Sequence, residues 1–339
     1  MIKVFVNGFG TIGKRIAAAV LKQDDMSLVG VAKKKPDFKA CIANKFGIPL
    51  YVFSEKDIEV FEEKGIKVKG TIDDALKECD IVVDAAPKKV GMENKKIYEK
   101  FDRKAIFQGG EKASIADVSF TAQVNYRAAL GKKYVRVVSC NTTALARIIN
   151  EIMRIAKIKR IRGTLVRRAA DPWEVKKGPI NAIVPTFSVP SHHAKDVKTV
   201  LGDINISTYA VVVPTTIMHM HVLNVEFENN VNEGDIISSL EDARRIIITP
   251  SDMGLDSTAT IMELARDLGR ERNDMYEVVI FREGIKVIDK ELWLSYAVHQ
   301  EAIVVPENID AIRAMFEVYK EPEKSIEKTD KSLGILRRL

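Results

Sequence analysis

The sequence predicts a two-domain α/β protein whose first domain holds a doubly wound parallel sheet and whose second domain is of α+β type. Three observations predict this class. Short strand-like and helix-like segments alternate up to residue 139. Longer, hairpin-like strands dominate after residue 140. A chain of 339 residues is also long for a single core. We therefore expect domains at 1–139 and 140–303, with a terminal segment, 304–339.

Composition narrows the class of protein further. Hydrophobic residues make up 46% and aromatic residues 7%, and the net charge of +6 comes from lysines spread among glutamates. That pattern favours small anionic substrates, or simple solubility, over nucleic acid, for which we expect no binding. No apolar run approaches the ~20 residues of a membrane helix, so no membrane association is expected.

The ends and the cysteines give two more expectations. The chain enters a strand at its first residues, which leaves no room for a signal peptide. Cys41, Cys79 and Cys140 are too widely spaced for a disulfide framework or a metal cluster. We therefore expect a cytoplasmic protein without a bound metal.

The first strand–helix–strand unit carries a glycine motif. A strand is expected at 2–6, a helix at 12–21 and a second strand at 28–32. Gly8, Gly10 and Gly13 form a Gly-x-Gly-x-x-Gly turn between the first strand and the helix. Such glycines permit a tight turn, close approach of a pyrophosphate and tight helix packing, so this unit predicts a Rossmann-type dinucleotide site.

The end of the second strand indicates which dinucleotide binds. A cofactor without a ribose phosphate usually meets an acidic residue about 20 positions beyond the glycines. Here that count reaches Lys33, followed by Lys34 and Lys35. Lysines attract a 2′-phosphate, so we expect NADP as the preferred cofactor and NAD as a second one. The alternative is a solvated basic turn.

The remainder of the first domain continues the alternation. Helices are expected at 37–46, 58–64, 71–78 and 91–101, and strands at 50–53, 80–85 and 105–107. The helix at 71–78 opens with Thr71 and Asp74, which is the spacing of a capping box. Gly109 and Gly110 follow the last of these strands and either admit a ligand or form a turn.

Cys140 lies at the junction between the two domains. A strand at 134–138 leads to it, and Asn141 or Thr142 is expected to cap the helix that follows. A thiol at that place faces unpaired N–H groups and the positive end of the helix dipole. This setting favours the thiolate, which is the nucleophilic form. The alternative is a small buried cysteine.

The second domain is expected to contain a mainly antiparallel sheet backed by helices. Strands are expected at 160–168, 207–213, 217–227, 276–281 and 292–298, and helices at 236–245 and 257–268. A terminal helix is expected at 306–319. The charged tail after it is expected to fray unless Leu333, Ile335 and Leu336 dock.

Histidines and anion-binding groups follow Cys140. Strand alternation places His219 and His221 on one face, and spacing alone does not choose which serves as base to the cysteine. Candidate donors to an anion are two arginines at a strand end, a loop with two histidines and a pair of threonines. These are Arg167 and Arg168, Ser191 with His192 and His193, and Thr215 with Thr216.

Taken together, these stretches resemble the glyceraldehyde-3-phosphate dehydrogenase family, in its archaeal branch. The resemblance rests on residues 6–15, 107–112, 139–143 and 214–219, with Val-His-Gln-Glu at 298–301. Ser-Cys-Asn-Thr-Thr at 139–143 is highly specific to this family. Lysines after the second strand depart from the aspartate of the other branch and resemble the archaeal enzymes that accept NADP.

The resemblance implies roles for individual residues. Cys140 would be the nucleophile and His219, rather than His221, the base. The residues implied at the cofactor are Gly8, Gly10, Thr11, Ile12, Gly13, Lys33, Lys34, Gly110, Arg168 and Gln300. Those implied at the substrate and phosphate are Ser139, Asn141, Arg167, His192, His193 and Thr216. The resemblance does not decide whether Arg167 or Arg168 binds the substrate phosphate.

The implied reaction is oxidation of D-glyceraldehyde 3-phosphate with inorganic phosphate and NADP or NAD, giving 1,3-bisphosphoglycerate. It would pass through a thiohemiacetal and a thioester on Cys140, with His219 taking the hydroxyl proton. The family also implies a homotetramer and a terminal helix that returns to the first domain. The alternatives are a related cysteine-dependent semialdehyde dehydrogenase, which needs a carboxylate site, and a basic binding protein built on the nucleotide fold.

Overall fold

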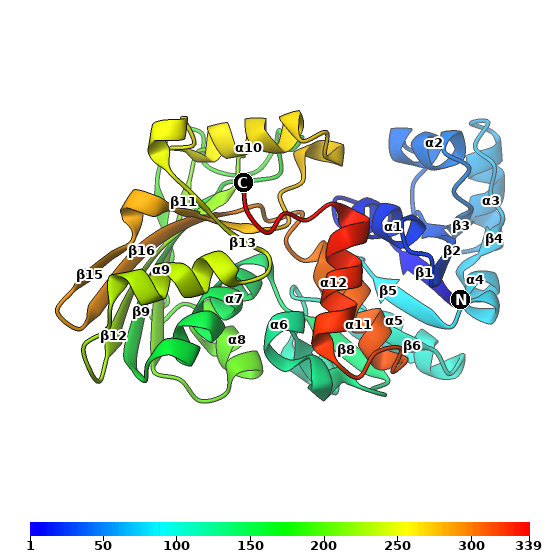
Figure 1. The fold of residues 1–339 in the computed structure, drawn as a ribbon. Helices are drawn as coiled ribbons and strands as arrows, with labels where there is room; N and C mark the ends of the chain where they lie inside the picture. Colours follow the sequence, from blue (N-terminus) through cyan, green and yellow to red (C-terminus); the bar gives the residue numbers. More distant parts are fainter. Residues whose placement is uncertain (88) are drawn as a thin grey trace. The chain divides into compact units, whose positions relative to one another are not determined.

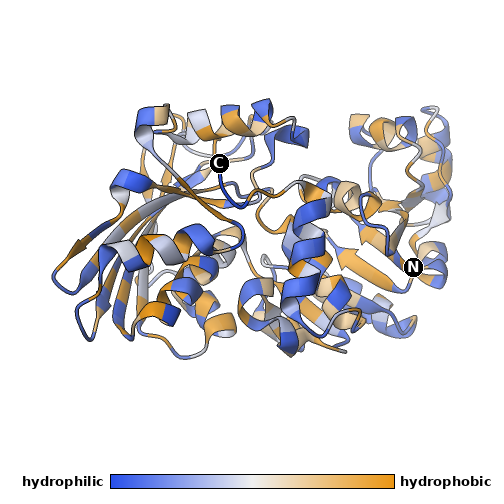
Figure 2. Cartoon of the chain, viewed as in Figure 1, coloured by the Kyte–Doolittle hydropathy of each residue, from blue (hydrophilic) through white to orange (hydrophobic). Residues whose placement is uncertain are grey.

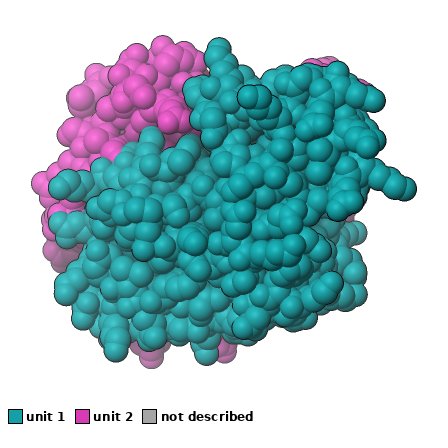
Figure 3. All heavy atoms as spheres, turned by 90° about the vertical axis from the view of Figure 1, so that its right-hand side faces the viewer, with its two compact units in different colours: residues 1–139, 305–333 teal, residues 140–304, 334–339 magenta. Residues whose placement is uncertain are grey.

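The chain divides into two compact units in a computed structural model that describes residues 1–87 and 89–339. Unit 1 comprises residues 1–139 and 305–333, and unit 2 comprises residues 140–304 and 334–339 (Figure 3). Each unit has its own eight-stranded sheet, so each is described by itself (Figure 1).

The elements of unit 1 alternate between strand and helix. In chain order they are β1 (Ile2–Asn7), α1 (Gly13–Leu21), β2 (Met26–Ala32), α2 (Phe38–Lys45), β3 (Leu50–Val52), α3 (Glu55–Glu62), β4 (Gly70–Thr71), α4 (Ile72–Glu78), β5 (Ile81–Asp84), α5 (Gly91–Lys100), β6 (Lys104–Gln108), β7 (Val118–Phe120), α6 (Ala122–Asn125) and β8 (Tyr134–Val137), with α11 (Val305–Met315) and α12 (Pro322–Leu333) from the end of the chain. The expected capping box at Thr71 and Asp74 is present on α4.

The sheet of unit 1 is parallel throughout, in the order β4-β3-β2-β1-β5-β6-β8-β7. The chain builds outward from β1 in one direction and then restarts at β5 on its other side, which is the doubly wound arrangement. The strands β3, β5 and β8 are fully buried, and β1 and β6 have buried apolar centres, as a sheet covered on both faces requires; the central strands appear as hydrophobic arrows in Figure 2. The predicted fold class is confirmed.

Unit 2 holds a mixed sheet in the order β10-β11-β9-β12-β16-β14-β13, with β15 added at β16. Only β9–β11 and β13–β14 pair in parallel among the described strands. Its elements are α7 (Cys140–Ile155), β9 (Ile158–Arg168), β10 (Val184–Pro185), α8 (His192–Leu201), β11 (Ile206–Val213), β12 (His219–Phe227), α9 (Glu233–Asp242), β13 (Ile246–Thr249), α10 (Thr258–Asp267), β14 (Val278–Phe281), β15 (Lys286–Ile288) and β16 (Glu291–Val298).

Two expectations about unit 2 are wrong at the residues that matter most. The helix after the first unit begins at Cys140 itself, so Asn141 and Thr142 lie in its first turn and do not cap it. His192 and His193 do not lie on a loop but form the first turn of α8, with Ser191 at the cap position. In both places the helix extends further toward its N-terminus than side-chain periodicity indicates.

The C-terminal region also differs from expectation. The helix predicted at 306–319 ends at Met315, and the charged tail does not fray but forms α12, whose apolar side is buried at Ile326 and Leu333. Only residues 305–333 of the terminal segment belong to unit 1, whereas residues 334–339 belong to unit 2. There the Leu336 N–H donates to Glu277, which is paired with Arg270.

Candidate active site

The glycine turn of unit 1 has the shape that a dinucleotide needs. Gly8 has a φ of +119°, and a Cβ there would come 2.7 Å from the Ala85 carbonyl oxygen. At Gly13 a Cβ would overlap the Gly8 carbonyl oxygen, whereas at Gly10 it would meet nothing within 4 Å. The first and third glycines thus permit a tight turn and close packing, and the second leaves open space where a pyrophosphate can approach.

The loops expected around a cofactor follow three strands of that sheet. Gly8 follows β1, Lys33 follows β2, and Gly110 lies in the turn after β6. Because all the strands are parallel, these loops leave the same edge, which is where doubly wound sheets bind ligands. Lys34 is exposed, but Lys33 is largely buried and its Nζ lies 2.7 Å from a carboxylate oxygen of Asp37.

The backbone before Cys140 is tightly packed within unit 1. A Cβ at Gly109 would come 2.1 Å from the Ser139 backbone nitrogen, so only glycine fits beside the residue that precedes the cysteine. Of the two alternatives for the Gly109–Gly110 turn, the structure therefore gives Gly109 a packing role. Cys140 itself is partly exposed at the first position of α7.

The surroundings of the Cys140 thiol shift its pKa in opposite directions. Burial raises the pKa of the Cys140 thiol to about 11, and the nearby Glu301 carboxylate adds to the rise. A hydrogen bond from the Asn141 backbone N–H and the charges of Arg167 and Arg168 oppose it. Desolvation exceeds these opposing effects, so the pKa of the thiol lies above its ordinary value.

His219 is held in one tautomer at the start of β12. The Arg168 backbone N–H donates to Nδ1 of His219 at 3.0 Å, so a neutral ring carries its proton on Nε2. Burial, with the charges of neighbouring histidines and arginines, lowers the pKa of His219 well below its ordinary value, which keeps the ring neutral. Its Nε2 is therefore a hydrogen-bond donor.

His221 is fully engaged in positioning Asn141. Its Nε2 lies 2.8 Å from Oδ1 of Asn141, and its Nδ1 lies 3.2 Å from the Tyr296 hydroxyl. Because the amide oxygen accepts, His221 donates from Nε2 and Tyr296 donates to Nδ1. Burial lowers the pKa of His221 to about 3, so this arrangement persists at neutral pH. The spacing of the two histidines did not separate these roles.

Arg167 and His193 both carry buried nitrogens that have no hydrogen-bond partner among the described residues. Arg167 at the end of β9 influences the titration of Cys140, His193, His219 and His221, which places it among them. Its Nε is buried with no hydrogen-bond partner among the described residues, and the same holds for both ring nitrogens of His193. Buried polar atoms without partners indicate a place for a ligand that accepts hydrogen bonds.

Arg168 shares the unpartnered Nε, but its terminal guanidinium nitrogens are already paired. Its guanidinium contacts Asp171 and lies 3.2 Å from Glu301, a buried carboxylate. Glu301 also accepts from Nε2 of His299 at 3.1 Å, and Nδ1 of His299 accepts from the Met275 N–H. His299, Glu301 and Tyr296 are not predicted as functional residues from the sequence, although the Val-His-Gln-Glu stretch is the available signal for the first two.

The remaining predicted positions lie in less constrained places. Thr216 is partly exposed in the loop between β11 and β12, and Gln300 is partly exposed after β16. His192 is exposed, with its ring centroid 3.9 Å from that of His193. Among residues 1–87 and 89–339 no cluster of ligating side chains suited to a metal occurs. Within the same residues no helix is both long and apolar enough to cross a membrane.

A doubly wound dinucleotide sheet joined to an α+β unit that begins with a cysteine defines the class of nicotinamide-dependent oxidoreductases. The sequence matches the family "Glyceraldehyde 3-phosphate dehydrogenase, C-terminal domain" at residues 139–281 and "Dihydrodipicolinate reductase, N-terminus" at residues 2–124. It is 55% identical to a glyceraldehyde-3-phosphate dehydrogenase of Metallosphaera sedula, over 99% of this chain and 98% of that one. Enzymes of the same name from Saccharolobus islandicus and Saccharolobus solfataricus are also 55% identical, over 99% of both chains.

The chain therefore belongs to the glyceraldehyde-3-phosphate dehydrogenase family, as its resemblance implied.

Proposed function

We propose that this protein is a phosphorylating dehydrogenase that oxidises D-glyceraldehyde 3-phosphate with inorganic phosphate and NADP or NAD, giving 1,3-bisphosphoglycerate. The observation that carries the proposal is the cluster in unit 2. There Cys140 opens α7 beside two arginines, and His219 presents an N–H from the start of β12. The family and the names of its relatives point to the same reaction.

The first step is attack of the Cys140 sulfur on the aldehyde carbon. The thiol first loses its proton to solvent water, because the thiolate is the nucleophile, and the Asn141 N–H with Arg167 stabilises that thiolate against the cost of its burial. A C–S bond then forms and the aldehyde oxygen becomes an alkoxide. A bound oxidised nicotinamide would supply the hydride acceptor for this carbon, and loss of the hydride would leave an acyl thioester on Cys140.

His219 acts in this proposal as a hydrogen-bond donor and not as the base that the resemblance implied. Its Nδ1 already accepts the Arg168 N–H, so the ring has no free lone pair with which to take a proton at Nε2. A thiolate nucleophile gives an alkoxide directly, so the oxidation needs no further proton removal. The Nε2–H is suited to stabilise the charge that develops on that oxygen.

Phosphate then attacks the thioester, the C–S bond breaks, and the thiolate leaves. We assign anion binding to Arg167 and His193 because both have buried nitrogens without partners among the described residues. Ser139, His192 and Thr216 remain proposed contacts. Nε of Arg168 is also buried without a partner among the described residues, but its two terminal nitrogens are already held by Ala170, Asp171 and Glu301, so Arg168 is the weaker candidate for binding a ligand.

The proposal places NADP and NAD on the glycine turn, with Lys34 as the exposed cation for a 2′-phosphate and Gln300 near the nicotinamide. The open space at Gly10 and the close packing at Gly8 and Gly13 support this. A cytoplasmic location belongs to the same proposal.

Steady-state reduction of each nicotinamide tests the function. With glyceraldehyde 3-phosphate and phosphate we expect continuous turnover. Without phosphate we expect one rapid equivalent of reduced cofactor per site and then little more, because the thioester accumulates. Turnover that ignores phosphate would contradict acyl transfer to phosphate, and oxidation of aspartate semialdehyde in place of the sugar phosphate would favour the alternative enzyme.

We also propose that the protein assembles with copies of itself into a homotetramer. The segment between β9 and α8 exposes large apolar side chains, among them Ile180 at 94% and Phe187 at 93%. Apolar residues exposed to this extent usually mark an interface, and a second copy offers the same surface in return. Sedimentation analysis should give four subunits for the wild type and a smaller species for Phe187→Asp. A monomeric wild type would refute this assembly.

A further inference from the structure

The segment between β2 and α2 lies where a bound dinucleotide places its adenosine ribose. β2 is the neighbour of β1, and the loop after β1 carries Gly8 and Gly10. In a doubly wound sheet the residues that follow the second strand meet the ribose of the adenosine half. A role of residues 33–37 in cofactor binding rests on the dinucleotide site proposed for the glycine turn.

Lys33 in this segment is not a free cation. Its Nζ lies 2.7 Å from Oδ2 of Asp37, and its side chain is only 12% exposed. The same carboxylate accepts the backbone N–H groups of Lys39 and Ala40 through Oδ1, at 3.0 and 3.2 Å. Asp37 therefore serves two functions at once, because it caps α2 and holds the Lys33 ammonium.

The charge of this pair bears directly on a ribose phosphate. Burial raises the pKa of Asp37, but the hydrogen bond and charge of Lys33 and the two N–H groups outweigh it, so the pKa lies below its ordinary value and the carboxylate is ionised. An ionised carboxylate repels a 2′-phosphate and neutralises the ammonium that would otherwise attract it. Lys34 is exposed and has no ion-pair partner among the described residues.

We propose that Asp37 sets the cofactor selectivity of this enzyme: by holding Lys33 it weakens binding of the 2′-phosphate and so allows NAD to be used beside NADP. Lys34 then provides the attraction that remains for NADP. Asp37 is a positioning residue in this scheme, because it acts on the phosphate through Lys33 as well as through its own charge.

Replacing Asp37 with asparagine tests this without removing the helix cap. Asparagine caps helices about as well as aspartate does, so α2 should keep its N-terminus. Calorimetric titration at low ionic strength should show about fivefold tighter binding of adenosine 2′,5′-bisphosphate by Asp37→Asn, as expected when a partly exposed charge pair is released. Binding of 5′-AMP, which lacks the 2′-phosphate, should change less than about twofold.

A double-mutant cycle with Lys33→Ala shows whether the effect passes through Lys33. We expect Lys33→Ala to weaken adenosine 2′,5′-bisphosphate binding more in the Asp37→Asn background than in the wild type, because only there is the ammonium free. Asp57→Asn removes an equivalent charge from the first turn of α3 and should leave both affinities unchanged. If Asp37→Asn destabilises the protein, Asp37→Ser provides a second capping residue.

The outcomes separate this inference from the proposed function. Equal selectivity in wild type and Asp37→Asn, with both nucleotides bound, overturns the role of Asp37 and leaves the dinucleotide site standing. An identical gain with and without Lys33 overturns the route through that lysine. A wild type that binds neither nucleotide refutes the dinucleotide site itself, and a Lys34→Ala variant with undiminished 2′-phosphate binding refutes its basic contact.

Discussion

Replacing Cys140 with serine should reduce the rate of glyceraldehyde 3-phosphate oxidation by about 10⁴-fold or more. A serine hydroxyl has almost no anion at neutral pH, and His219, whose Nδ1 already accepts from Arg168, has no lone pair at Nε2 with which to take the hydroxyl proton. Binding of NADP, measured by calorimetry, should remain close to wild type because the glycine turn lies in the other unit. Loss of both properties would indicate misfolding, and unchanged turnover would refute the nucleophile.

The matched control is Cys41→Ser, which alters an exposed cysteine and should leave activity unchanged. In that background, alkylation of Cys140 by iodoacetamide also tests the state of the thiol. Burial raises its pKa to about 11, so the thiolate fraction should grow about tenfold per pH unit up to that value. Cys79 is buried, with a pKa raised to about 12, and should react more slowly. A rate that levels off near neutral pH would contradict the raised pKa.

The sequence was sufficient to predict the fold class and the family. Glycine spacing and strand–helix alternation are local signals, and the packing at Gly8 and Gly13 explains why they predict a dinucleotide turn. The charge state of Cys140 could not be predicted in this way. The helix dipole is visible in the order of elements, but desolvation depends on what surrounds the sulfur after folding.

Side-chain partners across the sheet were equally inaccessible from the sequence. Alternation places His219 and His221 on the same face, yet one ring is fixed by the Arg168 N–H and the other by Asn141 and Tyr296. Likewise, a lysine at position 33 indicates a phosphate contact until Asp37 is found 2.7 Å from it. These distinctions arise from long-range or reciprocal contacts, for which periodicity carries no information.

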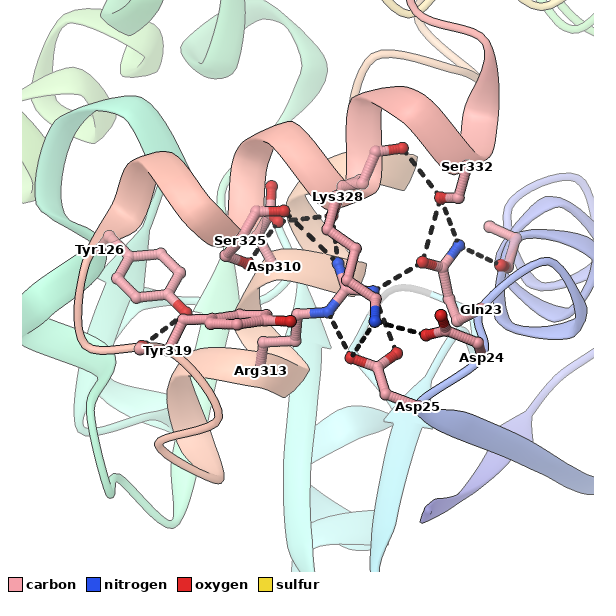
Figure 4. Close-up of polar contacts among 12 residues, drawn as sticks. Gln23, Asp24, Asp25, Tyr126, Asp310, Arg313, Tyr319, Ser325, Lys328 and Ser332 are labelled. Atoms are coloured by element: carbon pink, nitrogen blue, oxygen red, sulfur yellow. Dashed lines mark hydrogen bonds and ion pairs between the residues drawn. The ribbon is translucent and has the colours of Figure 1, made fainter.

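The largest effect on stability is expected at Arg313, a fully buried residue of α11 (Figure 4). Its guanidinium donates to both oxygens of Asp25 at 2.8 and 3.0 Å, to Gln23 at 2.7 Å and to Thr329 of α12 at 2.6 Å. It therefore joins the segment before β2 to both terminal helices of unit 1. The two helices are also joined directly, because Ser325 and Thr329 donate to Asp310.

Replacing Arg313 with methionine should lower the free energy of unfolding of unit 1 by about 3–5 kcal/mol, because it leaves the Asp25 carboxylate without its main partner. Urea denaturation and limited proteolysis of α12 measure this. Arg313→Lys keeps the positive charge but not the planar guanidinium, so its free energy of unfolding should lie between those of wild type and Arg313→Met. The exposed pair of Lys324 and Glu321 supplies the control, because Lys324→Ala should change stability by less than about 0.5 kcal/mol.

The difference in the free energy of unfolding between wild type and Arg313→Met should shrink at acidic pH. Burial raises the pKa of Asp25, but the hydrogen bond and charge of Arg313, with Lys328, outweigh it and hold the pKa below its ordinary value. A carboxylate with a lowered pKa stabilises the folded state above its unfolded pKa, and that contribution is lost as pH falls through the folded pKa. The gap between wild type and Arg313→Met should therefore narrow below about pH 4. A gap that is constant with pH would show that Arg313 stabilises unit 1 by packing rather than through Asp25.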